Sequence, residues 1–155
     1  MLLTVSGSST IKAPQAFVWK RVMDADAVAA CAPGVQSVEA VDDRHYRVVS
    51  ALGVGSIKLK FAMDVELADV VEPEQLAIVA RGQAPGSAVK VSTSLRLESL
   101  SGKETALRWK ADADFSGTIA SVGARLLQGT AKKLTEKFWR DFARETEKAA
   151  KTARR

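Results

Sequence analysis

The stretch SIKLKFAMDVELA, residues 56–68, decides the fold class of this 155-residue chain. Apolar side chains occupy every second position from Ile57 to Leu67, and most of the residues between them are charged. Alternation with a period of two over this length predicts a β-strand with one buried and one solvated face. The same tendency recurs in four further stretches, namely residues 45–52, 75–81, 89–97 and 106–114.

Short turn-forming segments separate these strands. They are Asp42-Asp43-Arg44, Gly53-Val54-Gly55, Glu72-Pro73-Glu74, residues 82–86 (GQAPG) and Ser101-Gly102-Lys103. Residues 2–11 and 35–41 are also rich in β-formers and add two strands to the series. Consecutive strands joined by tight turns form an antiparallel sheet with one face to bury.

The last third of the chain changes from strand to helix periodicity. Apolar and small residues recur there at three- and four-residue spacing: Ile119, Val122, Gly123, Leu126, Leu127, Thr130, Ala131, Leu134, Phe138 and Phe142. This spacing predicts one long amphipathic helix over about residues 116–150, capped by Ser116 or Thr118.

Two short helices are expected after the first strand. Ala13-Pro14 begins the first of them, since proline suits the first helical turn. Asp24 can cap the second, residues 25–31, and Pro33-Gly34 ends it.

These elements predict a single α+β domain over residues 1–155. A curved antiparallel sheet of about six to seven strands wraps around the long C-terminal helix, the one element long and apolar enough to cover it. Such a sheet tends to leave a hollow against the helix, and hollows of this kind bind ligands. We expect twelve residues to line it: Leu59, Phe61, Met63, Val91, Leu95, Trp109, Phe115, Ile119, Gly123, Leu126, Leu127 and Thr130. Position by position, a solid core is the simpler interpretation of these residues.

Gly123 and Gly129 fall inside the predicted helix, where each costs about 1 kcal/mol relative to alanine. They indicate either close approach of the helix to the sheet or room for a ligand. Arg125 could anchor a ligand's polar group or pair with an outward acid.

Four segments in order resemble a known family. They are Ala13-Pro14 with Val18-Trp19; residues 29–35 (AACAPGV) with Ser37-Val38-Glu39; residues 53–58 (GVGSIK) with Phe61; and residues 121–127 (SVGARLL) followed by Gly129, residues 131–134 (AKKL) and Phe138. The order of elements resembles the helix-grip superfamily of START and SRPBCC proteins, which includes lipid carriers and polyketide cyclases. More narrowly, the chain resembles the CoxG family of carbon monoxide dehydrogenase proteins.

The resemblance implies an accessory protein of a molybdenum-containing dehydrogenase. Family members are associated with recruiting the dehydrogenase to the membrane and with handling a quinone or similar apolar ligand. Some relatives end in a long apolar anchor, whereas this chain ends at Arg155 in a basic stretch. The resemblance therefore favours transient rather than permanent membrane contact.

The formal net charge of +5 is concentrated in the last part of the chain, with its basic end at about residues 144–155. Acidic residues are interleaved there, so a solvated helix face is the simpler interpretation. Attraction to an anionic membrane surface or to an acidic partner protein is the alternative. Nothing resembles an RNA-binding strand motif, so nucleic acid is not an expected partner.

Targeting signals are absent from the sequence as given. Polar residues follow Leu3 directly, and no apolar run is long enough to span a bilayer. With one cysteine, the chain has no intramolecular disulfide, which fits a reducing compartment. We expect a cytoplasmic protein, with peripheral contact at the inner face of the membrane.

The reactive side chains give little sign of catalysis. His45 is the one histidine and lies beside an acidic turn, where a surface role is the simpler interpretation. Cys31 lies between alanines and is expected to be a buried structural thiol. No residues show metal-ligand spacing, and Gly53-Val54-Gly55 lies between strands rather than before a helix, which excludes a phosphate loop. We therefore expect no catalytic residue, no metal and no cofactor other than a bound quinone or lipid.

Three functions follow from this pattern. The first is a carrier that binds a quinone or lipid-like molecule and helps to couple a molybdenum dehydrogenase to the membrane. The second is an enzyme of the polyketide cyclase or hydratase type, because one fold hosts several functions. The third is a structural adaptor with a filled core.

Overall fold

A computed structural model describes residues 1–153 of the chain. Its elements follow one another as β1 (Leu2–Ile11), α1 (Gln15–Val22), α2 (Ala25–Cys31), β2 (Val35–Ala40), β3 (His45–Val54), β4 (Ile57–Val71), β5 (Gln75–Ala84), β6 (Ser87–Ser101), β7 (Glu104–Gly117), the 3-10 helix η1 (Thr118–Val122) and α3 (Ala124–Ala153). Arg154 and Arg155, the end of the predicted basic tail, lie outside the described residues.

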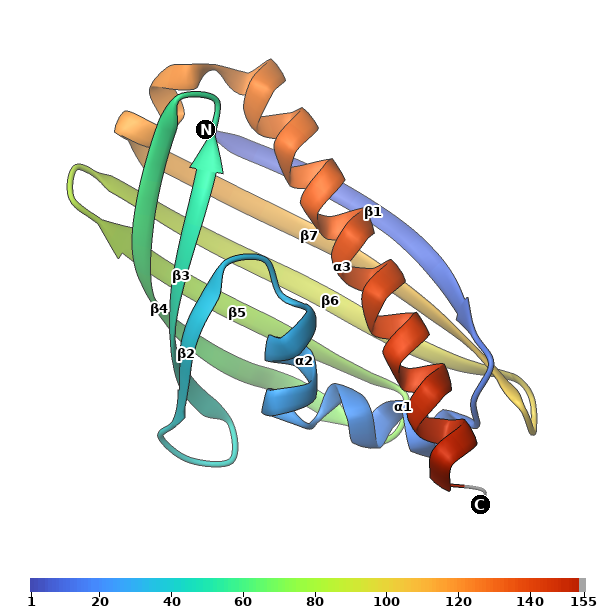
Figure 1. Cartoon of the computed structure of the whole chain (residues 1–155). Coiled ribbons are helices and arrows are strands. Elements are labelled where there is room, and N and C mark those ends of the chain that lie inside the picture. Colours follow the sequence, from blue (N-terminus) through green and yellow to red (C-terminus); the bar gives the residue numbers. More distant parts are fainter. Residues whose placement is uncertain (154–155) are drawn as a thin grey trace.

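All seven strands form one antiparallel sheet in the order β1-β7-β6-β5-β4-β3-β2. β2 to β7 are neighbours in sequence and in space, and β1 joins the sheet through β7. The sheet curls around α3, which runs diagonally along the β1 side, while α1 and α2 lie nearer the opposite edge (Figure 1). The α+β helix-grip fold expected from the sequence is confirmed, including both short helices.

Local sequence explains the short helices. The Asp24 side chain accepts hydrogen bonds from the backbone N–H groups of Asp26 and Ala27, as expected of an N-cap residue. In α1, Val18 and Val22 are buried against the sheet side of the domain. The two helices therefore present one apolar face inward.

The start of the long helix differs from the sequence prediction. Ser116 belongs to β7 and caps nothing, and η1 precedes α3, which begins at Ala124. Gly117 ends β7 at a φ of 80°, where a Cβ atom would lie 2.0 Å from the carbonyl oxygen of Gly86. Only glycine fits this close backbone approach, so the chain breaks there before any helix can start.

The two helix glycines also need correction. Gly123 lies at the junction of η1 and α3 with a φ of 96°, not in a helix interior. Gly129 is inside α3, but it is exposed and an added Cβ would have no atom within 4 Å. Gly123 is therefore required by backbone conformation, and neither glycine marks a close approach of helix to sheet.

The turn expected over residues 82–86 is shorter in the structure. Ala84 pairs with Ser87, which leaves a two-residue turn of Pro85 and Gly86. Gly82 lies inside β5, where a Cβ atom would come within 3.0 Å of Val89 and 3.1 Å of Met63. The turn-like composition gave a wrong prediction because Gly82 serves side-chain packing across the sheet.

Two groups of buried residues form the core. The larger lies beneath α1 and the second half of α3 and includes Trp109, Trp139 and Phe142. The smaller lies near η1 and includes Ile119 and Leu127. The Trp109 and Trp139 rings stack with centroids 5.6 Å apart, so this part of the space between helix and sheet is filled.

Candidate ligand-binding cavity

A cavity of about 220 Å³ lies between the short helices and the sheet rather than beneath α3. Its walls come from α1, α2 and strands β2 to β5: Val22, Met23, Ala25, Val28, Ala29, Ala32, Val35, Val38, Tyr46, Val48, Met63, Val65, Leu67 and Ile78. Figure 1 shows α2 and β2 standing over this part of the sheet, away from α3.

Alternation in the strands supplies the floor of the cavity. Met63, Val65 and Leu67 are alternate residues of β4, so their side chains leave the same face of the sheet. In β3, Tyr46 lies opposite Val65 and Val48 lies opposite Met63. These partners extend the apolar floor toward the edge strand β2.

The small side chains of α2 leave the space open. Ala25, Ala29 and Ala32 face the cavity at three- and four-residue spacing, with Val28 beside them. A leucine or phenylalanine at these positions would extend into the cavity. The space therefore depends on residue size in α2 as well as on curvature of the sheet.

Polar atoms contribute little to the cavity. Tyr46 has the one hydroxyl among its described lining residues, and that hydroxyl donates to the backbone carbonyl of Asp43 at 3.2 Å. The other lining side chains are hydrocarbons or methionine thioethers. Such a cavity can bind an apolar group by burial, and it offers no strong hydrogen-bond donor or acceptor from a side chain.

Of the twelve residues expected to bind ligand, Met63 alone lines this cavity. Phe61, Leu95 and Trp109 are buried, and the latter two belong to the larger core group. Leu59, Phe115, Ile119 and Leu127 pack together in the smaller core group. Val91 and Thr130 are half-buried elsewhere, and Gly123 lies at the start of α3.

Leu126 is the most exposed large apolar residue of the predicted set, at 43%. It lies at the beginning of α3 beside Gly55, where an added Cβ would come within 3.2 Å of its side chain. It therefore packs on the tip of the β3–β4 hairpin. Ligand binding by the eleven residues outside the cavity stays a prediction.

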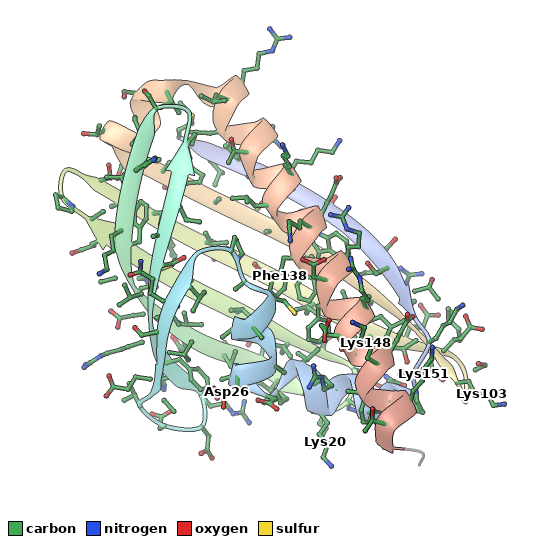
Figure 2. All side chains as sticks on the ribbon, in the orientation of Figure 1. Lys20, Asp26, Lys103, Phe138, Lys148 and Lys151 are labelled. Atoms are coloured by element: carbon green, nitrogen blue, oxygen red, sulfur yellow. The ribbon has the colours of Figure 1, made fainter. Side chains whose placement is uncertain are left out.

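Aromatic side chains of α3 explain the displacement of the hollow. Trp139 is absent from the predicted helix stripe, yet it packs between Trp109 and Phe142. Phe138 lies on the flank of α3 that is turned toward α2 (Figure 2), and its ring is 4.6 Å from that of Trp139. The consecutive aromatic residues Phe138 and Trp139 are the sequence signal that could have shown this space to be filled.

His45 lies on the surface, as expected. Its Nδ1 atom is 2.8 Å from an Asp42 carboxylate oxygen, and its Nε2 atom is 3.8 Å from Glu66. The hydrogen bond to Asp42 raises the pKa of the imidazole above its ordinary value. His45 does not line the cavity, and within residues 1–153 no cluster of three potential metal ligands occurs.

Cys31 is half-buried at the end of α2. Burial, reinforced by Glu145 and Asp141, raises the pKa of its thiol. A thiol held protonated in this way is a weak nucleophile. It lies on the other side of α2 from the cavity, in a polar groove.

Comparison with known proteins places the chain in a family. The family model for the carbon monoxide dehydrogenase protein CoxG matches residues 7–147. This protein belongs to the CoxG family. No curated protein matches the sequence.

Solved structures similar to this CoxG-family protein share its fold. A conserved protein from Geobacillus kaustophilus is 25% identical with a TM-score of 0.87, and the match covers 95% of this chain and 97% of that one. The Zhui aromatase/cyclase from a Streptomyces species is 17% identical with a TM-score of 0.72, covering 95% and 94%. A Chromobacterium violaceum protein is 17% identical with a TM-score of 0.68, covering 93% and 96%.

The helices of this CoxG-family protein were also compared with the requirements of a bilayer. Among residues 1–153, none of them combines the length and apolar character needed to cross a membrane. α3 is 30 residues long, but charged side chains recur along it.

Proposed function

We propose that this protein is a non-catalytic carrier that holds an apolar molecule in the cavity beneath α2. The observation that carries the proposal is the lining itself, which is apolar apart from one tyrosine. Burial of ligand surface there contributes about 25 cal/mol per Å² before the costs of association. The family match supports an accessory role with a carbon monoxide dehydrogenase or a related molybdenum enzyme.

The size of the cavity favours a ring or a short chain rather than a whole lipid. Its volume of about 220 Å³ is below the roughly 300–1,000 Å³ of typical drug-sized ligand sites. A quinone head group or one end of a lipid-like molecule matches this space, with the remainder outside. The methionines Met23 and Met63 suit such a ligand because their side chains adapt to irregular shapes.

The lining favours binding over catalysis. A cyclase needs a general acid or base within hydrogen-bond reach of its substrate. Among the described lining residues, Tyr46 is the one titratable group, and its hydroxyl already donates to Asp43. The likeness to the Zhui aromatase/cyclase is a likeness of fold at 17% identity, and fold does not determine function.

The place of work that we propose is the inner face of the membrane. The basic residues near the end of α3, among them Lys148 and Lys151 (Figure 2), would be attracted to anionic lipids. This contact would be peripheral and would weaken with salt. It would bring a cytoplasmic carrier close to both an apolar ligand and a membrane-associated dehydrogenase.

The experiment uses the purified full chain and menadione as the quinone probe. First, organic extracts of the protein are analysed by mass spectrometry for a stoichiometric apolar molecule. Thermal unfolding is then followed with added menadione, which raises Tm if it binds the folded state. A filled extract or a saturable Tm shift supports the carrier, and an empty extract with no shift supports an adaptor.

A matched pair of variants locates the binding. Ala29→Leu extends a side chain into the cavity, whereas Ala30→Leu makes the same change one residue along α2, outside it. We expect menadione binding to weaken about tenfold in Ala29→Leu, because the added side chain occupies the space of the ligand. Equal binding by both variants would place the ligand elsewhere. Turnover of a polyketide substrate would instead support the cyclase function.

A further inference from the structure

A second groove lies on the opposite side of α2 from the cavity. It has a volume of about 500 Å³ and runs between the short helices and α3. Its walls are Arg21, Ala27, Ala30, Cys31, Lys137, Arg140, Asp141, Arg144 and Glu145. α2 therefore separates an apolar cavity from a groove that is dominated by charge, which we call the cationic groove.

The carboxylates of the cationic groove are already engaged. Asp141 accepts from Lys137 Nζ at 2.6 Å and from Arg144 Nη2 at 3.1 Å. Glu145 lies 3.5 Å from Lys148, one turn farther along α3. The hydrogen bond from Lys137 lowers the pKa of Asp141, so this carboxylate is charged and committed to its two partners.

Two cations of the groove remain without an acid in the part of the chain that the structure describes. Arg21 Nε is buried and has no hydrogen-bond partner within residues 1–153. Arg140 forms no hydrogen bond or ion pair over the same range. An unpartnered buried donor is unfavourable unless an acceptor is supplied from outside, and guanidinium groups match carboxylates in a two-pronged geometry.

We propose that the cationic groove is a docking site for an acidic segment of a partner protein, with Arg21 and Arg140 binding its carboxylates. This inference goes beyond carriage of an apolar molecule and does not depend on what the cavity holds. The groove is recessed between helices, which suits a side chain or strand of chain rather than a flat surface. Docking there would place the partner directly against α2, the wall of the cavity.

The other walls favour a protein over a membrane. Peripheral membrane binding uses apolar side chains that insert beside the cations. The exposed large apolar residues described in the structure are Met1, Leu2, Val41, Val71, Leu100 and Leu126. None of them lines the groove, and Asp141 and Glu145 would face the lipid charges.

The test compares two variants of the full chain that lose the same charge. Arg21→Gln with Arg140→Gln removes the two unpaired cations of the groove. Arg125→Gln with Lys132→Gln removes two exposed cations of α3 that lie outside it. Binding of a fluorescein-labelled oligoglutamate peptide is followed by anisotropy at low salt, with oligoglutamine as the uncharged peptide.

We expect the groove variant to bind oligoglutamate about tenfold more weakly than wild type, and the control variant to bind within about twofold. Cys31 provides a second measurement, because it is the one cysteine of the chain and lines the groove. Bound peptide should slow alkylation of Cys31 by iodoacetamide in wild type and in the control variant, but not in the groove variant.

Three outcomes would overturn the proposal. The first is equal weakening of both variants, which would show diffuse attraction to a basic protein. The second is peptide binding that leaves Cys31 alkylation unchanged, which would place the peptide elsewhere. The third is no peptide binding by wild type together with groove-dependent binding to phosphatidylglycerol vesicles, which would assign the groove to lipid.

Discussion

The space beneath the second half of α3 and the space beneath α2 border the same sheet but differ in content. Under α3, Trp139 and Phe142 cover Trp109, with ring centroids 5.6 Å and 5.7 Å apart along the series. Under α2, the covering residues are alanines and a valine, and about 220 Å³ stays open. The size of the covering side chains therefore decides where a helix-grip domain is solid and where it is hollow.

The comparison also separates two kinds of constraint on sequence. In the filled region each side chain touches others on all sides, so a change in volume is felt directly. In the hollow region part of each side chain faces open space, which tolerates additions and loses less on deletion. The following substitutions, one pair on each side of the comparison, measure that difference.

The largest effect is expected from matched leucine deletions. Leu107 is fully buried in the filled region, and Leu67 lines the cavity. Leu107→Ala should lower the free energy of unfolding by about 3–5 kcal/mol, and Leu67→Ala by less than half of that, since fewer contacts are lost. Urea denaturation followed by tryptophan fluorescence measures both. Similar losses at the two sites would mean that the cavity collapses or is filled.

A smaller effect is expected from matched additions. Ala13 is fully buried in the packed core, and Ala29 faces the cavity. Ala13→Leu should cost about 1–3 kcal/mol through overpacking, whereas Ala29→Leu should change stability by less than about 0.5 kcal/mol. The midpoints of urea unfolding without ligand give the two values. A large loss in Ala29→Leu would contradict the open space beneath α2.

The smallest effect concerns His45, on the hairpin that carries Tyr46 into the cavity wall. The pKa of His45 is raised from 6.5 by Asp42, so its contribution to stability is complete below 6.5 and disappears as the pH rises through the folded-state value. The pKa of Asp42 is lowered from 3.8, chiefly by the backbone N–H of Arg44, so its contribution disappears as the pH falls toward acid. The pair is therefore most effective between these two ordinary values.

His45→Gln should accordingly be less stable than wild type near pH 5 and nearly equal to it at pH 8. The change is small because the pair is exposed to solvent and salt. Arg47→Gln removes a nearby exposed cation that keeps its charge over this range, so its difference from wild type should not vary with pH. A constant difference for His45→Gln would exclude the Asp42 pairing as its cause.

Strand positions could be predicted from the sequence because alternation is a local property. The run from Ile57 to Leu67 indicates its buried face without knowledge of any neighbour. The same holds for Asp24, whose capping role depends on the residues that follow it directly. These features determined the fold class and the order of its elements.

The cavity could not be placed in the same way, because it depends on which helix covers which part of the sheet. α3 packs along β1, a pairing that no local pattern predicts, and this leaves the floor formed by Val48 and Met63 to α2. Trp139 then fills the space that was expected to be open. Cys31 and Arg21 likewise come together with α3 only in three dimensions.

The pairing of β1 with β7 has a consequence for synthesis of the chain. Leu2 pairs with Asp114, whereas each of the other strands pairs with a neighbour in sequence. On a ribosome adding roughly 5–20 residues per second, β1 waits about 5–20 s after it emerges before its partner exists. During that interval the nascent meander can assemble pairwise while its first strand has nowhere to dock, which makes this strand the natural target for a chaperone.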